Sequence, residues 1–273
     1  LYYLPGNIDT MKGQDILIDE FQKGAFAMEI VDGMTTKEAA DVKQKIEQVD
    51  GVADVIWYDS IADLSMPISE LPDNLKDVFY KDDATLMAIF FDDTTSADST
   101  MDAIKEIRSV TNEQCYLSGM SAVVTDIKNL SEKEMPIYVL IAVVLSCIVL
   151  SIFTDCWVLP IFFMLSIGMA IIYNMGSNYV LGQISYITKA LSAVLQLAVT
   201  MDYSIFLWHS YNEQRELHDD PKEAMAYAIH NTLTSVIGSS ITTVAGFAAL
   251  CFMSFTLGRD LGIVMAKGVV LGV

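Results

Sequence analysis

Cysteine, histidine and basic side chains are scarce in this sequence. The four cysteines are widely spaced, so neither a disulfide framework nor a zinc site is expected. The three histidines lie 9 and 12 residues apart, which suits no metal-binding motif. The 16 Lys and Arg residues are outnumbered by 35 Asp and Glu residues, and the net charge of -19 disfavours nucleic acid as a partner.

The sequence also lacks the motifs of common enzymatic sites. It has no glycine-rich phosphate loop and no Walker lysine, so ATP is not expected as an energy source. Ser118 and Ser121 do not lie in a nucleophile elbow. We therefore predict no enzymatic activity, no cofactor and no metal.

Hydrophobic residues, by contrast, make up 53% of the chain, and they are separated from the charge. Residues 1–135 hold 27 acidic and 11 basic side chains, and residues 136–273 hold only 8 and 5. We expect a water-soluble domain at 1–135 followed by a membrane domain at 136–273. The sequence begins without methionine and stops within an apolar run, so we expect it to be a piece of a longer protein.

The second half contains long apolar runs, four of which reach or approach the roughly 20 residues needed to cross a bilayer. A fifth is truncated by the end of the sequence. The runs are 136–154, 157–175, 186–208, 232–252 and 261–273. The amphipathic segment 210–231 contains Arg215 and Lys222, so the positive-inside rule places it in the cytoplasm. Counting spans back places residues 1–135 on the extracytoplasmic side of the plasma membrane.

Two strand, helix, strand units are predicted in the soluble half. The first runs from the strand AFAMEIV through a helix opened by a Thr35–Glu38 capping box to the strand VADVIWY. The second runs from TLMAIFF, through a helix capped by Ser96 or Asp98, to QCYLSG. Two such units usually form an antiparallel sheet with both helices on one face, the ferredoxin-like βαββαβ fold of the α+β class. Residues 58–84 form an acidic insertion whose role the sequence does not indicate.

After Gly119, the apolar residues Val123, Ile127 and Leu130 lie on one helical face. This spacing predicts a helix that leads from the soluble domain into the first span. Pro136 lies at its membrane entry, where it forms either a hinge or a rigid elbow.

One aspartate, Asp202, lies in the middle of the apolar run LAVTMDYSIFLWH. An ionised carboxylate at the centre of a spanning helix costs about 2.5–3.5 kcal/mol on insertion scales. It therefore needs a partner in the helix bundle, a water-filled cavity or a bound proton. A carboxylate that binds and releases a proton as it opens to either side of the membrane is a natural proton carrier.

Two features near Asp202 bear on this hypothesis. His209 returns to nearly the same helix face, so it either extends a proton relay or is an interfacial histidine with no such role. A stripe of small and partly polar residues on the fourth run either hydrates or bonds Asp202, or serves only as a packing seam. The stripe consists of Thr232, Ser235, Ser239, Thr242 and Gly246.

The segment VTMDYSIFLWHSYNEQRE resembles the fourth transmembrane helix and following segment of the MMPL branch of the resistance-nodulation-division (RND) exporters, which carries an Asp-Tyr pair. Three more segments resemble this family in the same order: LPGNIDTMKGQDILIDEF, SGMSAVVTDIKNLSEKEM and ALCFMSFTLGRDLGIVMAKGVVLG. The resemblance implies that the soluble half is the first porter domain and that the apolar runs are spans two to six. It also implies that Asp202 and Tyr203 belong to the proton relay.

The same resemblance implies proton-driven export of lipids, amphipathic compounds or drugs. Membrane lipids and a hydrophobic or amphipathic substrate would then be partners, together with the second half of the transporter or a partner subunit. Family members often carry glycine ahead of the Asp-Tyr pair, where this chain has Ala198. Two alternatives are a non-transporting lipid sensor or scaffold similar to the sterol-sensing domain, and a secretion-accessory subunit.

Overall fold

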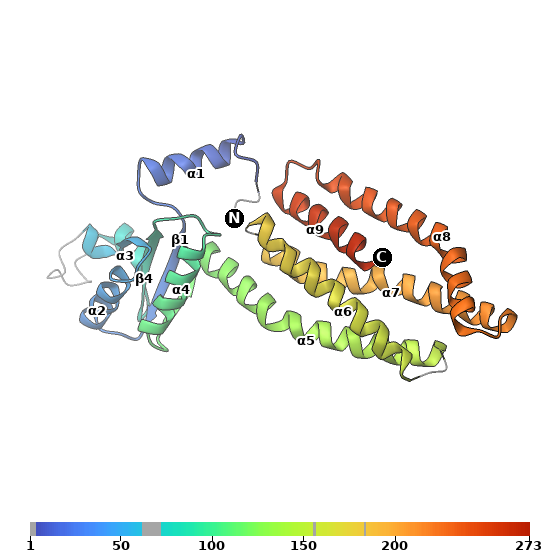
Figure 1. The fold of residues 1–273 in the computed structure, drawn as a ribbon. Coiled ribbons are helices and arrows are strands. Elements are labelled where there is room, and N and C mark those ends of the chain that lie inside the picture. Colours follow the sequence, from blue (N-terminus) through green and yellow to red (C-terminus); the bar gives the residue numbers. More distant parts are fainter. Residues whose placement is uncertain (1–3, 62–71, 155–156, 183) are drawn as a thin grey trace. The chain divides into compact units, whose positions relative to one another are not determined.

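The computed structural model describes residues 4–61, 72–154, 157–182 and 184–273. The chain is mostly helical, with one small antiparallel sheet (Figure 1). Beyond the first five residues it divides into two compact units, Gly6–Asn129 and Leu130–Val273, here named the sheet unit and the bundle unit. The division falls within helix α5 (Met120–Thr154).

The described residues of the sheet unit form five strands and four α-helices before α5 begins. In chain order these elements are α1 (Asp9–Asp19), β1 (Phe26–Asp32), α2 (Thr36–Glu47), β2 (Val52–Ile56), the 3-10 turn η1 (Tyr58–Ser60), α3 (Asp73–Phe79), β3 (Tyr80–Lys81), β4 (Ala84–Phe91), α4 (Asp98–Val110) and β5 (Cys115–Ser118). The strand order is β2-β4-β1-β5, and every described pair is antiparallel. This is the strand order of a βαββαβ sheet.

Strand β3 was not predicted, and it comes from the insertion at 58–84. Tyr80 pairs with Thr85, on the same edge of β4 that β2 covers further along, from Ala88 to Phe91. The insertion therefore returns to complete an edge that would otherwise expose unpaired backbone groups. Residues 62–71 of the insertion lie outside the described part of the chain.

Helices α2 and α4 cover one face of the sheet. Buried and less buried residues alternate along β1 and β4, so every second side chain points toward these helices. On β1 the side chains of Ala27, Glu29 and Val31 are buried, while their neighbours along the strand are exposed. The helices contribute residues at helical spacing to the same core. These residues are Ala39, Val42 and Ile46 on α2, and Ala103, Ile104 and Ile107 on α4.

The predicted capping box of α2 is confirmed. The Thr35 backbone N–H donates to Glu38 Oε2 at 2.9 Å, and Thr35 Oγ1 accepts from the Glu38 backbone N–H at 3.4 Å. The predicted cap of α4 is wrong, because Ala97 holds the N-cap position without a side-chain bond. The carboxylate of Asp98, already in the helix, binds Lys128 Nζ on α5 at 2.8 Å instead.

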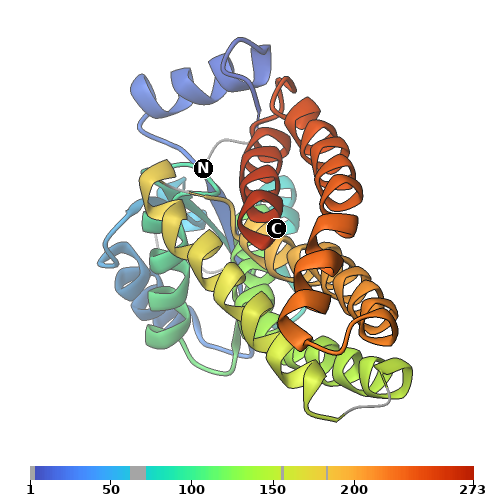
Figure 2. The same cartoon turned by 45° about the vertical axis from the view of Figure 1, so that its right-hand side comes forward.

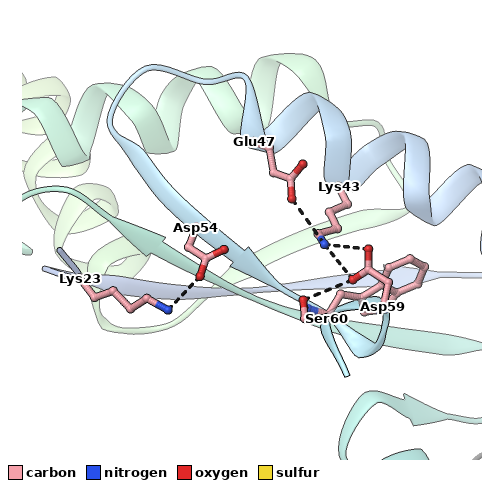
Figure 3. A network of polar contacts seen from close by, with 7 residues as sticks. Lys23, Lys43, Glu47, Asp54, Asp59 and Ser60 are labelled. Carbon is pink, nitrogen blue, oxygen red and sulfur yellow. Dashed lines mark hydrogen bonds and ion pairs between the residues drawn. The ribbon is translucent and has the colours of Figure 1, made fainter. Parts of the chain in front are cut away.

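The predicted strand VADVIWY ends early, at Ile56, and the chain then turns into η1. Trp57 is fully buried there, and its indole N–H donates to Thr85 Oγ1 at 2.7 Å. An ion pair stabilises the same region: Lys43 Nζ on α2 lies 2.8 Å from Asp59 Oδ1 in η1. Figure 3 shows the two side chains pointing toward each other. These contacts explain why Trp57 and Tyr58 leave the strand and pack into the core.

The described part of the bundle unit contains the remainder of α5 and four further α-helices. These are α6 (Leu159–Ser177), α7 (Tyr186–Leu217), α8 (Pro221–Leu250) and α9 (Thr256–Gly272), with the 3-10 turn η3 (Asn178–Leu181) after α6. Helices α7, α8 and α9 pack against one another, and α6 packs against α7 and α9 (Figures 1 and 2). Pro136 lies inside α5, so the helix continues through the expected hinge or elbow.

Among the described residues, four helices are long and apolar enough to cross a membrane: α5, α6, α7 and α8. Helix α9, which carries the fifth expected run, has 17 residues. The segment 210–231 does not form a helix of its own. It is divided between the end of α7 and the start of α8. The Asp220 side chain caps α8 by accepting from the Lys222 backbone N–H at 3.0 Å, and Pro221 occupies the first helical position.

Candidate functional site

A cavity of about 420 Å³ lies between α7 and α8 in the bundle unit. It is lined by Asp202, Tyr203, Ile205, Phe206, Ser235, Val236 and Ser239. The apolar side chains form most of its wall, and the polar groups are one carboxylate, one phenol and two hydroxyls. Such a cavity combines space for water or a small group with a few convergent polar side chains.

Helical spacing explains why these residues meet. On α8, Ser235 and Ser239 are four residues apart and therefore lie on one face. On α7, Asp202 and Phe206 have the same spacing. Because α7 and α8 pack side by side, the two faces close around one cavity.

Asp202 is exposed in this chain, and within the described residues it has no hydrogen bond or ion pair in the structure. Tyr203 is half-buried beside it. A carboxylate in a spanning helix is strongly disfavoured in contact with lipid tails. The open side of the cavity therefore requires water or a further protein surface.

The other expected site residues lie elsewhere. The side chain of His209 is 80% exposed, its Nε2 lies 3.6 Å from Glu213 Oε1, and it does not line the cavity. Thr242 donates its hydroxyl to the Ser239 carbonyl oxygen at 2.7 Å, and it does not line the cavity either. The structure thus brings Asp202, Tyr203, Ser235 and Ser239 together and leaves His209 and Thr242 apart.

A second polar group in the bundle was missed by the sequence analysis. Asn174 on α6 is fully buried, and its amide nitrogen donates to Gln196 Oε1 on α7 at 2.8 Å. The Gln196 amide nitrogen donates in turn to the Gly268 carbonyl oxygen on α9 at 3.2 Å. A Cβ at Gly268 would lie 2.6 Å from the Asn174 amide nitrogen, so glycine permits this close approach.

Lys267 joins the same group from α9. Its ammonium donates to the Asn174 carbonyl oxygen at 3.1 Å and to Asn178 Oδ1 in η3. Polar side chains within apolar runs were the signal that would have found these residues.

Fold and site together define a multi-pass membrane protein whose helix bundle holds a carboxylate-lined cavity. The sequence model of the MMPL family matches residues 3–273, nearly the whole chain. This chain belongs to the MMPL family of membrane proteins.

The chain is also similar to several curated proteins. It is 29% identical over 121 residues to the putative membrane protein ActII-3 of Streptomyces coelicolor, which covers 42% of this chain and 17% of that protein. It is 27% identical over 165 residues to the siderophore exporter MmpL5 of Mycobacterium tuberculosis, covering 57% of this chain and 17% of that protein. It is 24% identical over 187 residues to the probable transport protein MmpL4 of Mycobacterium leprae, covering 65% of this chain and 19% of that protein. The similarity spans less than a fifth of each of these relatives.

Proposed function

We propose that this chain forms part of a proton-driven exporter of lipids or other amphipathic compounds, with Asp202 as the proton-binding group. The observation that carries the proposal is the cavity in which this intramembrane carboxylate lies beside Tyr203 and two serine hydroxyls. Similarity to proteins named as an exporter and as transport proteins supports the same class.

The cavity is large enough for proton exchange through water. At roughly 30 Å³ per water molecule, its 420 Å³ corresponds to about a dozen waters. Waters that bridge the Asp202 carboxylate to Ser235 and Ser239 would stabilise the ionised form, and a bound proton would stabilise the carboxyl when that water leaves. Transfer of one charge through 100 mV provides about 2.3 kcal/mol, which is enough to bias two arrangements of a helix bundle.

The proposed architecture extends beyond this chain. The sheet unit would be the first porter domain, outside the plasma membrane, and α5 to α9 would be spans two to six of one RND-type half. A second half, or a partner subunit, would cover the open side of the Asp202 cavity, because lipid is a poor neighbour for that carboxylate. Membrane lipids and the exported amphipathic compound would be the other partners.

The experiment is substrate efflux from cells that carry the full-length protein with Asp202→Asn. We expect efflux to fall at least about a hundredfold at equal membrane abundance, since the amide cannot exchange the proton. Glu216→Gln is the matched control, because it removes an exposed carboxylate further along the same helix. Efflux that survives Asp202→Asn at the level of the control would reject Asp202 as the proton-binding group.

The proton gradient separates this function from the two alternatives. Efflux by the unmodified protein should stop when a protonophore collapses the gradient and resume when the protonophore is washed out. A sensor, a scaffold or a secretion-accessory subunit would show no efflux of its own under either condition.

A further inference from the structure

A second cavity, of about 290 Å³, lies in the sheet unit against β1, α4 and β5. Its lining residues are Glu29, Arg108, Thr111, Asn112, Glu113, Cys115 and Leu117. Arg108, Asn112 and Glu113 are exposed, as charged and amide side chains usually are. None of these groups takes part in the proposed export mechanism.

Glu29 is the exceptional member of this lining. It occupies an inward-facing position of β1, between Met87 on β4 and Leu117 on β5, and it is 0% exposed. Neither of its carboxylate oxygens has a hydrogen-bond partner among the described residues. A buried, unpartnered carboxylate strongly favours its uncharged form.

The cation that faces Glu29 is already occupied. Arg108 on α4 lines the same cavity, but its guanidinium binds Asp126 on α5 in a bidentate manner, with the second nitrogen 2.9 Å from Oδ2. Burial raises the pKa of Glu29 to about 7, and the charge of Arg108 acts in the opposite direction. The pKa of Arg108 is raised by its bond to Asp126 and by the charge of Glu29.

The remaining charged or titratable groups around Glu29 are few. Glu113, in the turn between α4 and β5, and Cys115, on β5, line the cavity. Burial raises the pKa of the Cys115 thiol, so this group stays neutral near pH 7. Lys45 on α2 acts on Cys115 through its charge, which lowers the pKa of the thiol.

We propose that Glu29 is a proton-binding site of the sheet unit, and that Glu29 and Asp126 are alternative partners of Arg108. When Glu29 holds its proton, Arg108 stays bound to Asp126 and ties α4 to the start of α5. When Glu29 releases the proton to water in the cavity, the new carboxylate requires a cation, and among the described residues that line the cavity Arg108 carries the positive charge.

The exchange gives the sheet unit two states that differ by one proton. In the protonated state α4 and α5 are joined by Arg108–Asp126 and by Lys128–Asp98. In the ionised state the first of these bonds is weakened, while β1 and α4 become joined through Glu29 and Arg108. The pH of the surrounding compartment thus sets a contact at the first turns of α5, the helix that continues into the first candidate span.

The first test is an infrared titration of the full-length protein in lipid nanodiscs. The protonated carboxyl band that is present in the unmodified protein and absent from Glu29→Gln reports on Glu29 alone. We expect this band to disappear with a midpoint near pH 7. A midpoint near the ordinary glutamate value of about 4.3, or no band at any pH, would overturn the proposal.

The second test addresses the exchange of partners. Asp126→Asn frees Arg108, so the Glu29 midpoint should fall by about one pH unit or more. Asp98→Asn is the matched control, because it removes the other ion pair between α4 and α5 without touching Arg108, and it should leave the midpoint unchanged. An equal midpoint in the Asp126→Asn and Asp98→Asn proteins would overturn the alternative pairing.

This inference does not rest on the proposed export. Both tests read a carboxyl group in the sheet unit and require no transport. Both tests could still support the Glu29 proposal if the Asp202→Asn protein exported normally. A negative result at Glu29 would not contradict the proposed role of Asp202.

Discussion

Two carboxylates, one in each unit, lie where carboxylates are costly, and their surroundings differ in an instructive way. Glu29 belongs to a water-soluble domain, yet it is fully buried with both oxygens unpartnered. Asp202 belongs to an apolar span, yet it is exposed at the open cavity between α7 and α8. The apolar character of the neighbouring sequence therefore does not determine how buried a carboxylate is.

The difference follows from the element that carries each residue. A strand in a sheet covered on one face must bury every second side chain, so Glu29 is enclosed by its own domain. A helix in a bundle buries only the side chains that contact other helices, and Asp202 lies at the cavity between α7 and α8, where it stays exposed. Glu29 is thus enclosed by its own domain without a partner, whereas the cover of Asp202 must come from water or another protein surface.

The largest expected effect concerns the burial of Glu29. Because its folded pKa is raised to about 7, the folded state keeps the proton while the unfolded state releases it, so stability falls as pH rises from the unfolded pKa to about 7. Above pH 7, Glu29→Gln should stabilise the sheet unit by about 3 kcal/mol, and below about pH 4 it should have little effect. Thermal unfolding followed by the fluorescence of buried Trp57, with the other two tryptophans replaced by phenylalanine, measures the difference.

The control for this measurement is Asp32→Asn, which lies on the same strand but is exposed. Its stability should depend on pH as that of the unmodified protein does. If Glu29→Gln gives no more stabilisation at high pH than Asp32→Asn, then Glu29 is not desolvated as its burial indicates.

Local sequence signals predicted the elements of the sheet unit only in part. The capping box of α2 depends on two residues three positions apart, and the structure has it, whereas the cap of α4 predicted from the same kind of signal is wrong. Strand β3 and the early end of β2 depend on pairing with β4, a contact between distant parts of the chain. Glu29 lies in the predicted strand AFAMEIV, but its burial without a partner depends on residues of α4 and β5 that are distant in the sequence.

The second prediction tests whether the Asp202 cavity contains water. In a background without the native cysteines, Ser239→Cys should react with a small charged thiosulfonate about tenfold faster than Ile241→Cys, because thiolate forms in water and not in lipid. Ile241 is the matched position: it lies on the same helix, is 62% exposed and does not line the cavity. Equal reaction rates would mean that the cavity is dry, and water would then not be what covers Asp202.

The candidate site shows the same division between local and distant signals. Asp202 was predicted as a carboxylate in an apolar run, and spacing on α8 placed Ser235 and Ser239 on one helical face; all three line the cavity. Spacing also selected His209 and Thr242, which share those faces in projection but lie beyond the cavity. The Asn174–Gln196 pair joins different helices, so no pattern within one helix predicted it.

The smallest expected effect concerns this paired amide, which is the counterpart of the two unpartnered carboxylates. Asn174→Leu leaves Gln196 Oε1 without its donor on α6 and should destabilise the bundle unit by about 1 kcal/mol, because polar contacts between membrane helices are individually weak. Gln196→Leu in addition removes the group left unpaired, so the two changes should cost less together than the sum of the single changes. Unfolding in mixed detergent micelles, measured for all four proteins, gives the coupling. A coupling of zero would show that the two amides contribute to stability independently of each other, and the Asn174–Gln196 bond would then not stabilise the bundle unit.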